Sequence, residues 1–239
     1  MTTYVLVGGA WIGGWIWRPV AAKLREAGHD VYTPTLTGLG ERVHLVSPEI
    51  DLETHIKDIV NVMEFEDLTD AVLVGHSYSG FVVTGVADRI PDRISLLAYL
   101  GSGVPSDGEA LVDGFGEEGR EFLQSIVDEH GDGWQMPVWP NARDLAGPIT
   151  DQQWAWFMAR AVPHPFATFL QPLRLDSNAA GQVIRAFLYC TKEDPEGGDY
   201  VPEYKSDPDW KYYELETGHW PMITMPDELT AVLLDMAER

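Results

Sequence analysis

The sequence has a single cysteine, Cys190, among its 239 residues. One cysteine allows no intramolecular disulfide and cannot build a thiolate-rich metal centre. Redox chemistry is therefore not expected, and we predict that the protein uses neither a metal ion nor another cofactor.

An N-terminal targeting segment and long apolar runs are also missing. Met1, Thr2 and Thr3 carry no basic side chain and lead directly into a short apolar segment, whereas a secretory signal begins with basic residues. No apolar stretch approaches the length needed to cross a bilayer. We therefore expect a soluble, cytoplasmic protein that does not act on a membrane.

Basic residues are scarce, because 16 Lys and Arg stand against 38 Asp and Glu and give a formal net charge of -22. A field of this sign repels phosphate backbones and anionic lipid surfaces, so nucleic acid is a poor partner. The simplest interpretation of the acidity is a heavily solvated surface. We expect a small molecule as the partner. The sequence does not define the oligomeric state, and a homodimer is compatible with it.

Apolar, β-rich segments alternate with helix-like segments at both ends of the chain. With 45% apolar residues, the chain can bury one well-packed core. The alternation is typical of an α/β protein, in which helices cover both faces of a parallel sheet. The expected strands are residues 4–7, 29–33, 71–74, 94–100, 183–189 and 210–215, and the expected helices are residues 17–27, 51–66, 81–89 and 226–237.

This alternation stops in the middle of the chain. Residues 105–178 are rich in Gly, Pro and Trp, with one helical stretch near residues 152–161 and no convincing strand. An interruption of this length between core strands is usually a functional insertion. We therefore expect residues 1–104 and 179–239 to form the core domain and residues 105–178 to form an inserted cap subdomain.

Residues 75–80, with the sequence Gly-His-Ser-Tyr-Ser-Gly, lie between the most buried-looking strand and a helix. A nucleophile elbow occupies this position, because a serine in a strained turn needs small neighbours where strand and helix cross closely. The usual motif is Gly-x-Ser-x-Gly, whereas here Ser79 takes the last position and Gly80 follows it. We predict Ser77 as a catalytic nucleophile.

Acyl transfer also needs a base and donors for the developing oxyanion. His219 follows the last expected strand on a short loop before the final helix, so we predict it as the general base. His76 is expected to pack beneath the elbow, and His29, His55 and His130 to be surface or helix residues. We predict that the oxyanion hole is formed by the backbone N–H groups of Ala10, after the first strand, and Tyr78, after the nucleophile.

With these segments in view, the sequence resembles the plant methylesterase and hydroxynitrile lyase group of α/β hydrolases and its bacterial relatives. The resemblance spans nearly the whole chain. It implies the α/β-hydrolase fold, with a mainly parallel six-stranded sheet flanked by helices, an inserted helical cap, and ester cleavage through an acyl-enzyme intermediate. The segments that carry it are residues 5–11, the Gly-His-Ser elbow, Tyr99-Leu100, Cys190-Thr191 and Gly218-His219.

Two departures from the family pattern concern the site. Gly8 replaces a histidine that is common after the first strand, and the acidic member of the triad is ambiguous. The family places an aspartate closely after Cys-Thr, where this chain offers Glu193, Asp194 and, past two glycines, Asp199. We favour Asp194, because it is the expected residue type and lies immediately beyond a strand. Glu193 and Asp199 stay open.

Nine tryptophans are many for a chain of this length, and several of them lie in the inserted segment. Aromatic walls bury apolar groups well and do little for charged ones. We predict a substrate pocket lined by Trp11, Trp134, Trp156 and Trp220 that takes a small apolar or aromatic ester, lactone or thioester. Each of these side chains could equally pack the cap onto the core.

Three other functions compete with ester hydrolysis. A dinucleotide site after the first strand is disfavoured, because Ala10 occupies the place of its second glycine. A hydroxynitrile lyase of the same family would carry a threonine and a lysine where this chain has Gly9 and Trp220. A cyclase or a non-catalytic ligand-binding protein would tolerate a weakened triad. A fluorophosphonate probe separates this last class, since only an active hydrolase is labelled at Ser77.

Overall fold

A single parallel sheet organises the protein. The computed structural model describes residues 1–139, 142–177, 179–192 and 203–238. Six strands lie in the order β2-β1-β3-β4-β7-β8, and every neighbouring pair is parallel, which confirms the predicted fold class. The strands are β1 (Thr3–Val7), β2 (Asp30–Tyr32), β3 (Ala71–His76), β4 (Ile94–Leu100), β7 (Ile184–Cys190) and β8 (Trp210–Leu215).

The chain first runs outward from β1 to the edge strand β2 and then crosses back to β3, on the other side of β1. The strand order therefore reverses between β1 and β3. In open α/β sheets, ligands bind beyond the carboxyl ends of the strands at such a switch point. The register pairs Val7 with Gly75, so these two strands end side by side.

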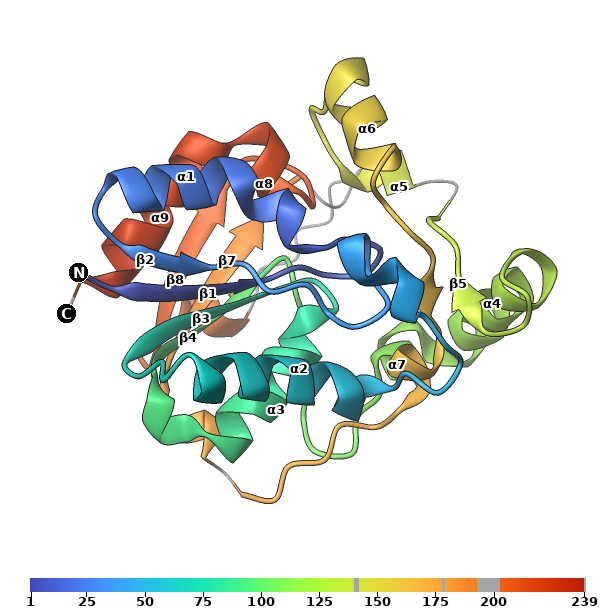
Figure 1. Ribbon diagram of the computed structural model, residues 1–239, viewed down its shortest axis with the longest axis horizontal. Coiled ribbons are helices and arrows are strands. Elements are labelled where there is room, and N and C mark those ends of the chain that lie inside the picture. The colour runs from blue at the N-terminus through green and yellow to red at the C-terminus, as the bar shows by residue number, and fades with distance from the viewer. Residues whose placement is uncertain (140–141, 178, 193–202, 239) are drawn as a thin grey trace.

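Helices cover both faces of the sheet (Figure 1). Helix α1 (Arg18–Glu26), the short helix α8 (Pro221–Thr224) and helix α9 (Pro226–Ala237) lie on one face, and helices α2 (Leu52–Phe65) and α3 (Ser79–Arg89) on the other. Alternate residues of β1 enter opposite cores, because successive side chains of a strand point to opposite faces. Tyr4 and Leu6 join the α1 side, and Val5 and Val7 the α2 side.

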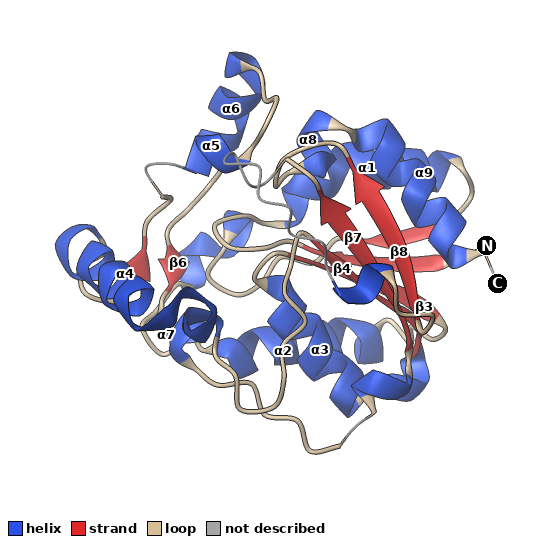
Figure 2. Ribbon diagram, turned by 180° about the vertical axis from the view of Figure 1, so that it is seen from behind, coloured by secondary structure: helices blue, strands red, loops and turns tan. Residues whose placement is uncertain are grey.

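Most of the segment between β4 and β7, which we call the cap segment, lies beyond the carboxyl ends of the strands, and its last part runs back along α2 and α3 (Figure 2). It contains α4 (Gly116–His130), α5 (Ala142–Leu145), α6 (Asp151–Met158) and α7 (Ala167–Leu170), with the short strands β5 (Gln135–Met136) and β6 (His164–Pro165). The described residues also contain six 3-10 helices, at Gly14–Trp17, Gly40–Leu45, Pro91–Arg93, Leu111–Phe115, Ala180–Gln182 and Glu203–Lys205.

In the cap segment the sequence predicted α6 but missed α4, the four-residue helices α5 and α7, and the two short strands. In α4 the buried residues Leu123 and Val127 are four positions apart, as in an amphipathic helix, but Gly116 and Gly119 weaken the helical signal. A two-residue strand has no periodicity that sequence analysis can detect. The strand β5 forms only through its antiparallel pairing with β6, far along the chain.

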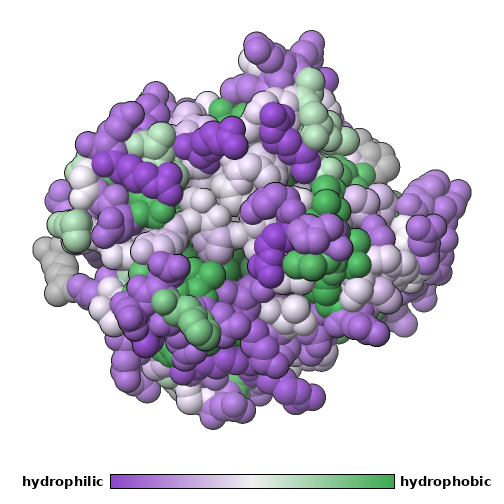
Figure 3. All heavy atoms as spheres, in the orientation of Figure 1, coloured by the Kyte–Doolittle hydropathy of each residue, from purple (hydrophilic) through white to green (hydrophobic). Residues whose placement is uncertain are grey.

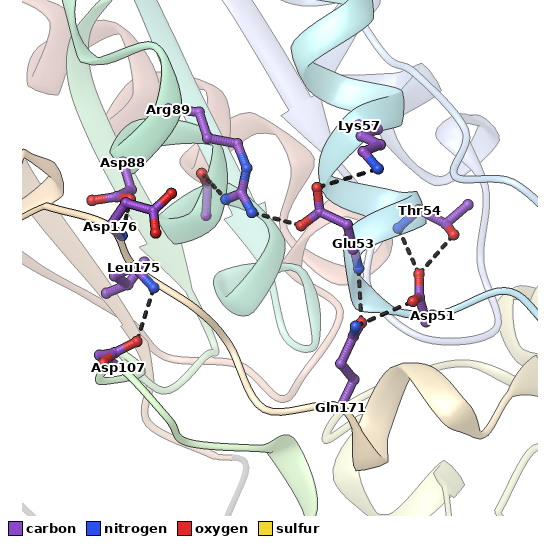
Figure 4. A network of polar contacts seen from close by, with 11 residues as sticks. Asp51, Glu53, Thr54, Lys57, Asp88, Arg89, Asp107, Gln171, Leu175 and Asp176 are labelled. Carbon is purple, nitrogen blue, oxygen red and sulfur yellow. Dashed lines mark hydrogen bonds and ion pairs between the residues drawn. The ribbon is translucent and has the colours of Figure 1, made fainter.

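Polar contacts fasten the end of the cap segment to helices α2 and α3 (Figure 4). The Asp88 carboxylate accepts from the backbone N–H of Asp176 at 2.8 Å and of Ser177 at 3.2 Å. The Gln171 side chain accepts from Glu53 N–H at 2.9 Å and donates to Asp51 at 3.1 Å. These bonds satisfy backbone donors that would otherwise be left without partners, so they hold the returning chain against the core.

The surface seen in Figure 3 is mostly hydrophilic, with separate apolar patches, as the excess of acidic residues suggests. Among the helices of the described part of the chain, none is long and apolar enough to cross a membrane.

Candidate active site

The predicted nucleophile Ser77 occupies the sharp turn between β3 and α3. Its φ of 54° lies in the left-handed region, which is strained for a residue other than glycine. Three hydrogen bonds hold this conformation: Ser77 N–H donates to the Leu100 carbonyl at 3.0 Å, and the Ser77 carbonyl accepts from Gly80 N–H at 2.9 Å and Ser102 Oγ at 2.7 Å. Ser77 is partly exposed between buried neighbours, as a nucleophile elbow requires.

The structure explains why a serine can take the last position of the elbow motif. A Cβ at Gly80 would overlap Ser102 Oγ and would lie 2.8 Å from the Gly103 carbonyl. The Ser79 side chain is fully buried, and its hydroxyl donates a hydrogen bond to the Gly8 carbonyl. The second glycine of the elbow must therefore be at position 80, and Ser79, which replaces the usual glycine of the motif, bonds to Gly8, which replaces the family's histidine.

The predicted oxyanion donors belong to two segments that meet at Ser77, since Tyr78 follows Ser77 directly and Ala10 follows Gly9. A Cβ on Gly9 would lie 2.8 Å from Ser77 Cβ, so the chain leading to Ala10 passes directly against the elbow. Ala10 and Tyr78 are 6% and 2% exposed. Within the described residues, neither backbone N–H donates to another backbone group. Buried N–H groups are rarely left without a partner, so this pair is suited to a negatively charged oxygen.

His219 is held in place through its backbone. Its N–H donates to the Leu145 carbonyl at 2.8 Å, and its carbonyl accepts from His76 Nε2 at 2.7 Å. The His76 ring is fully buried beneath the elbow, as expected, and its centroid lies 4.7 Å from that of His219. Because His76 directly precedes Ser77, this contact brings the predicted base beside the predicted nucleophile.

The cap segment meets the His219 loop backbone to backbone. A Cβ on Gly218 would overlap Ala146 and Gly147, and one on Gly147 would lie 2.8 Å from Gly218 N. Only glycine at both positions permits this approach. The loop that carries His219 and residues 145–147 of the cap segment therefore form one packed unit.

The three candidate acids, Glu193, Asp194 and Asp199, lie outside the described residues. The chain just before them is fixed, because Lys192 N–H donates to the Thr217 carbonyl at 2.9 Å. Thr217 lies two residues before His219. Among the described residues, no group of three or more His, Cys, Asp or Glu side chains could hold a metal ion.

The predicted pocket tryptophans separate into two groups. The Trp220 ring lies 5.1 Å from the His219 ring, and Trp11 follows Ala10, so both border the site. Trp156 instead packs against Trp15, with ring centroids 5.0 Å apart. Trp134 is partly exposed, and its carbonyl accepts from Phe166 N–H at 2.9 Å. Of the four, Trp220 packs beside the predicted base, and Trp11 adjoins a predicted oxyanion donor.

An apolar groove of about 840 Å³ opens along α4, with Phe115, Phe122, Ile126, Trp139 and Leu145 among its lining residues. Two of these residues also contact the site. The Trp139 ring lies 5.6 Å from that of Trp11, and the Leu145 carbonyl binds His219 N–H. Trp139 is one of the tryptophans of the inserted segment, but its role was not apparent from the sequence, because the groove depends on α4, which was not predicted.

Two further buried histidines lie close to Tyr78. His55 was expected at the surface or in a helix, and it does lie in α2, but its side chain is fully buried. His164, in β6, is also fully buried and was not singled out from the sequence. Burial lowers the pKa of His55 to about 4, despite a hydrogen bond to Thr37 that raises it. Burial also holds the pKa of His76 and His164 well below the ordinary value.

We predict that Gly80→Ala damages the elbow far more than Ser79→Ala does. The alanine methyl would displace Ser102 and strain the turn, at a cost of about 1–3 kcal/mol in unfolding free energy and a loss of turnover of at least about tenfold. Ser79→Ala removes one buried hydrogen bond and should cost about 1 kcal/mol. Urea unfolding and aryl ester turnover measure both variants. Equal effects would contradict the assignment of Gly80.

The buried histidines make stability depend on pH. Their pKa is lower in the folded than in the unfolded protein, so unfolding takes up protons as pH decreases below about 6.5. Stability is therefore highest above that pH and falls below it, by about 1 kcal/mol per buried histidine between pH 6.5 and pH 5.5. Urea unfolding across this interval measures the slope. The His55→Gln variant should have a shallower slope, and an unchanged one would refute this origin.

Comparisons with known proteins agree with this geometry. The model of the alpha/beta hydrolase family matches residues 4–232. A carbendazim hydrolyzing esterase of a Nocardioides species is 38% identical over 243 residues and covers 98% of each chain. Methylesterase 9 of Arabidopsis thaliana is 26% identical and covers 100% of this chain and 99% of its own.

Solved structures extend the similarity to three dimensions. An extracellular alpha/beta-hydrolase from a Paenibacillus species, described as sharing structural and functional homology with tobacco salicylic acid binding protein 2, superposes with a TM-score of 0.88 at 25% identity over 100% of both chains. Tomato methylketone synthase I, at 22% identity and a TM-score of 0.78 over 99% of this chain and 97% of its own, shares the fold. By sequence and by fold, the chain belongs to the alpha/beta hydrolase family.

Proposed function

We propose that the protein hydrolyses small, neutral carboxylic esters, with Ser77 as nucleophile and His219 as general base. The observation that carries the proposal is the strained, partly exposed Ser77. The backbone N–H groups of Ala10 and Tyr78 have no backbone acceptor among the described residues, and the His219 carbonyl accepts from His76, the residue before Ser77. The protein is a carboxylic ester hydrolase, because its relatives over nearly the whole length are esterases and methylesterases.

In the proposed mechanism, neutral His219 accepts the Ser77 hydroxyl proton while Ser77 Oγ forms a bond to the ester carbonyl carbon. The carbonyl oxygen becomes an oxyanion that accepts from the N–H groups of Ala10 and Tyr78. As the carbonyl re-forms, the bond to the alcohol oxygen breaks and His219 returns the proton to the leaving alcohol. Water then repeats the sequence on the acyl-enzyme, which releases the acid and restores Ser77.

We propose Asp194 as the carboxylate that orients His219. Such a group fixes the histidine tautomer and stabilises its protonated form. The bond between Lys192 N–H and the Thr217 carbonyl, at 2.9 Å, supports a position near residue 193 or 194, since it joins this part of the chain to the His219 loop. Glu193 and Asp199 are the alternatives.

The groove along α4 supports an apolar or aromatic substrate. Its aromatic wall continues to Trp11 through Trp139, and its volume of about 840 Å³ is within the range of small-molecule pockets. Glu129 and Asp144 also line it, and the net charge is -22, so anionic substrates are disfavoured. Carbendazim, named for the relative that is 38% identical, is a rational first compound to test beside aryl esters, lactones and thioesters.

The lyase alternative is disfavoured by the packing at Gly9. A Cβ there would lie 2.8 Å from Ser77 Cβ and 2.9 Å from the His76 carbonyl, so this chain has no room for the threonine expected of a lyase. From the sequence alone, we further propose a cytoplasmic location and no role for nucleic acid. Homodimer formation is an open alternative.

Ser77→Ala should abolish aryl ester hydrolysis and labelling by a fluorophosphonate, because it removes the oxygen that forms the covalent intermediate. The fold should persist, since only a hydroxyl is lost. The matched control is Ser95→Ala, in β4, whose Oγ donates to the Asp70 carbonyl. It should keep turnover and labelling. Substantial activity of pure Ser77→Ala protein would refute the assignment.

Asp194→Asn should lower kcat by orders of magnitude while leaving the unfolding midpoint unchanged, as expected when a triad loses its carboxylate. Glu193→Gln and Asp199→Asn are the matched comparisons and should each keep kcat within about threefold of the original protein. A loss confined to one of the comparisons would move the role to that residue. Three harmless substitutions would mean that His219 works without a carboxylate from this segment.

A further inference from the structure

A compact polar cluster lies behind the elbow, buried between α2, α3 and the cap segment. Its members are the side chains of His55, Tyr78, His164 and Thr168, each at most 2% exposed. The Tyr78 ring packs 5.7 Å from His55 and 4.8 Å from His164, measured between ring centroids. The proposed mechanism uses only the Tyr78 backbone and leaves these side chains without a role.

On the α2 side, the hydrogen bonds fix one proton arrangement. His55 Nε2 lies 2.9 Å from the Thr37 carbonyl, which can only accept, so this nitrogen carries the proton. His55 Nδ1 is then an acceptor for the Tyr78 hydroxyl, 2.9 Å away. This hydrogen bond holds the Tyr78 side chain against helix α2.

On the cap side, the same reasoning applies to His164. Trp11 N–H donates to His164 Nδ1 at 3.4 Å, so the proton is on Nε2, which donates to Thr168 Oγ1 at 2.8 Å. Thr168 in turn donates to the Pro165 carbonyl at 2.7 Å. If His164 carried a second proton, on Nδ1, two N–H groups would face each other and the hydrogen bond from Trp11 N–H to His164 would be lost. Neutral His164 therefore accepts a hydrogen bond from the backbone N–H of Trp11, the residue after Ala10.

Trp11 needs such support. Its φ of 65° is left-handed, a conformation that a bulky residue rarely adopts without compensation. Its indole N–H also donates into the cap segment, to the Met136 carbonyl at 3.1 Å. The Trp11 carbonyl also accepts from Val162 N–H at 3.0 Å. Three hydrogen bonds to the cap segment thus hold the residue that follows Ala10, and the peptide plane between Gly9 and Ala10 depends on the conformation of this turn.

We infer that His164 and His55 are positioning residues, which hold the N–H groups of Ala10 and Tyr78 in the orientation that the oxyanion requires. This inference rests on the proposed function. It makes the oxyanion hole a shared product of the core and the cap segment, since His164 lies in β6 and packs on Tyr78. The core strands alone would leave the Trp11 turn without its acceptor.

The test compares His164→Phe with His164→Asn. Phenylalanine keeps a planar ring and loses the acceptor, whereas asparagine Oδ1 lies near the position of Nδ1 and can accept from Trp11 N–H. For aryl ester hydrolysis, His164→Phe should lower kcat by about 10- to 100-fold and change KM by less than about threefold, a smaller loss than removal of an oxyanion donor. His164→Asn should stay within about threefold of the original kcat.

A transition-state analogue separates positioning from general loss of structure. An aryl trifluoromethyl ketone adds Ser77 Oγ to its carbonyl and leaves a tetrahedral oxyanion, so its Ki should rise in His164→Phe by the factor by which kcat/KM falls. The exposed His44 provides the matched control, and His44→Phe should change neither value. Urea unfolding verifies that each variant is folded at the assay temperature.

Three outcomes would each overturn the inference. They are an unchanged kcat in folded His164→Phe, an unchanged Ki beside a reduced kcat in that variant, and an Asn variant as impaired as the Phe variant. If His164→Phe does not fold, Thr168→Val removes the acceptor that fixes the His164 tautomer and should lower kcat and raise Ki in parallel, by about threefold or more. If Thr168→Val changes neither kcat nor Ki, the inference is likewise overturned. An original protein that neither hydrolyses esters nor reacts with a fluorophosphonate would refute the proposed function itself.

Discussion

The close approach of Gly9 to Ser77 is the constraint on which the site depends. Strands β1 and β3 are neighbours whose register ends with Val7 beside Gly75, so the turns that follow them must share one small volume. A Cβ on Gly9 would lie 2.8 Å from Ser77 Cβ, which explains why small residues gather here. The bond from Ser79 to the Gly8 carbonyl ties the first turn of α3 to the end of β1. One steric requirement thereby fixes the separation between the proposed nucleophile and the Ala10 peptide.

Burial imposes a second, electrostatic constraint, on the charge of the histidines behind the elbow. The rings of His55, His76 and His164 are removed from water, so their charged forms are disfavoured and each ring has a lowered pKa. These neutral rings therefore contribute no positive charge toward a developing oxyanion. The buried rings therefore supply direction through hydrogen bonds, and the positive ends of backbone dipoles supply the electrostatic stabilisation.

Local patterns were sufficient for most of the core and for the strained turn that carries the proposed nucleophile. The strands 94–100 and 210–215 and the helix 226–237 have the expected bounds, because β-rich segments and an amphipathic helix that begins at a proline leave clear local signals. Ser77 was found because its turn demands a characteristic local composition. His164 and the groove were not found, since their importance comes from contacts with Trp11 and α4 that are distant in sequence. The choice among the acids likewise depends on a distance that spacing does not define.

The glycine contact between the cap segment and the His219 loop bears on how substrates reach Ser77. Leu145 binds His219 N–H, and Gly147 and Gly218 touch through their backbones, so this part of the cap segment cannot swing away without displacing His219. A hinged lid is therefore incompatible with a continuously assembled site at this edge. With the backbone fixed here, the side chains that line the groove would decide which substrates fit. New substrate ranges would then arise from exchanges of groove side chains such as Phe115 and Trp139, with the backbone around His219 unchanged.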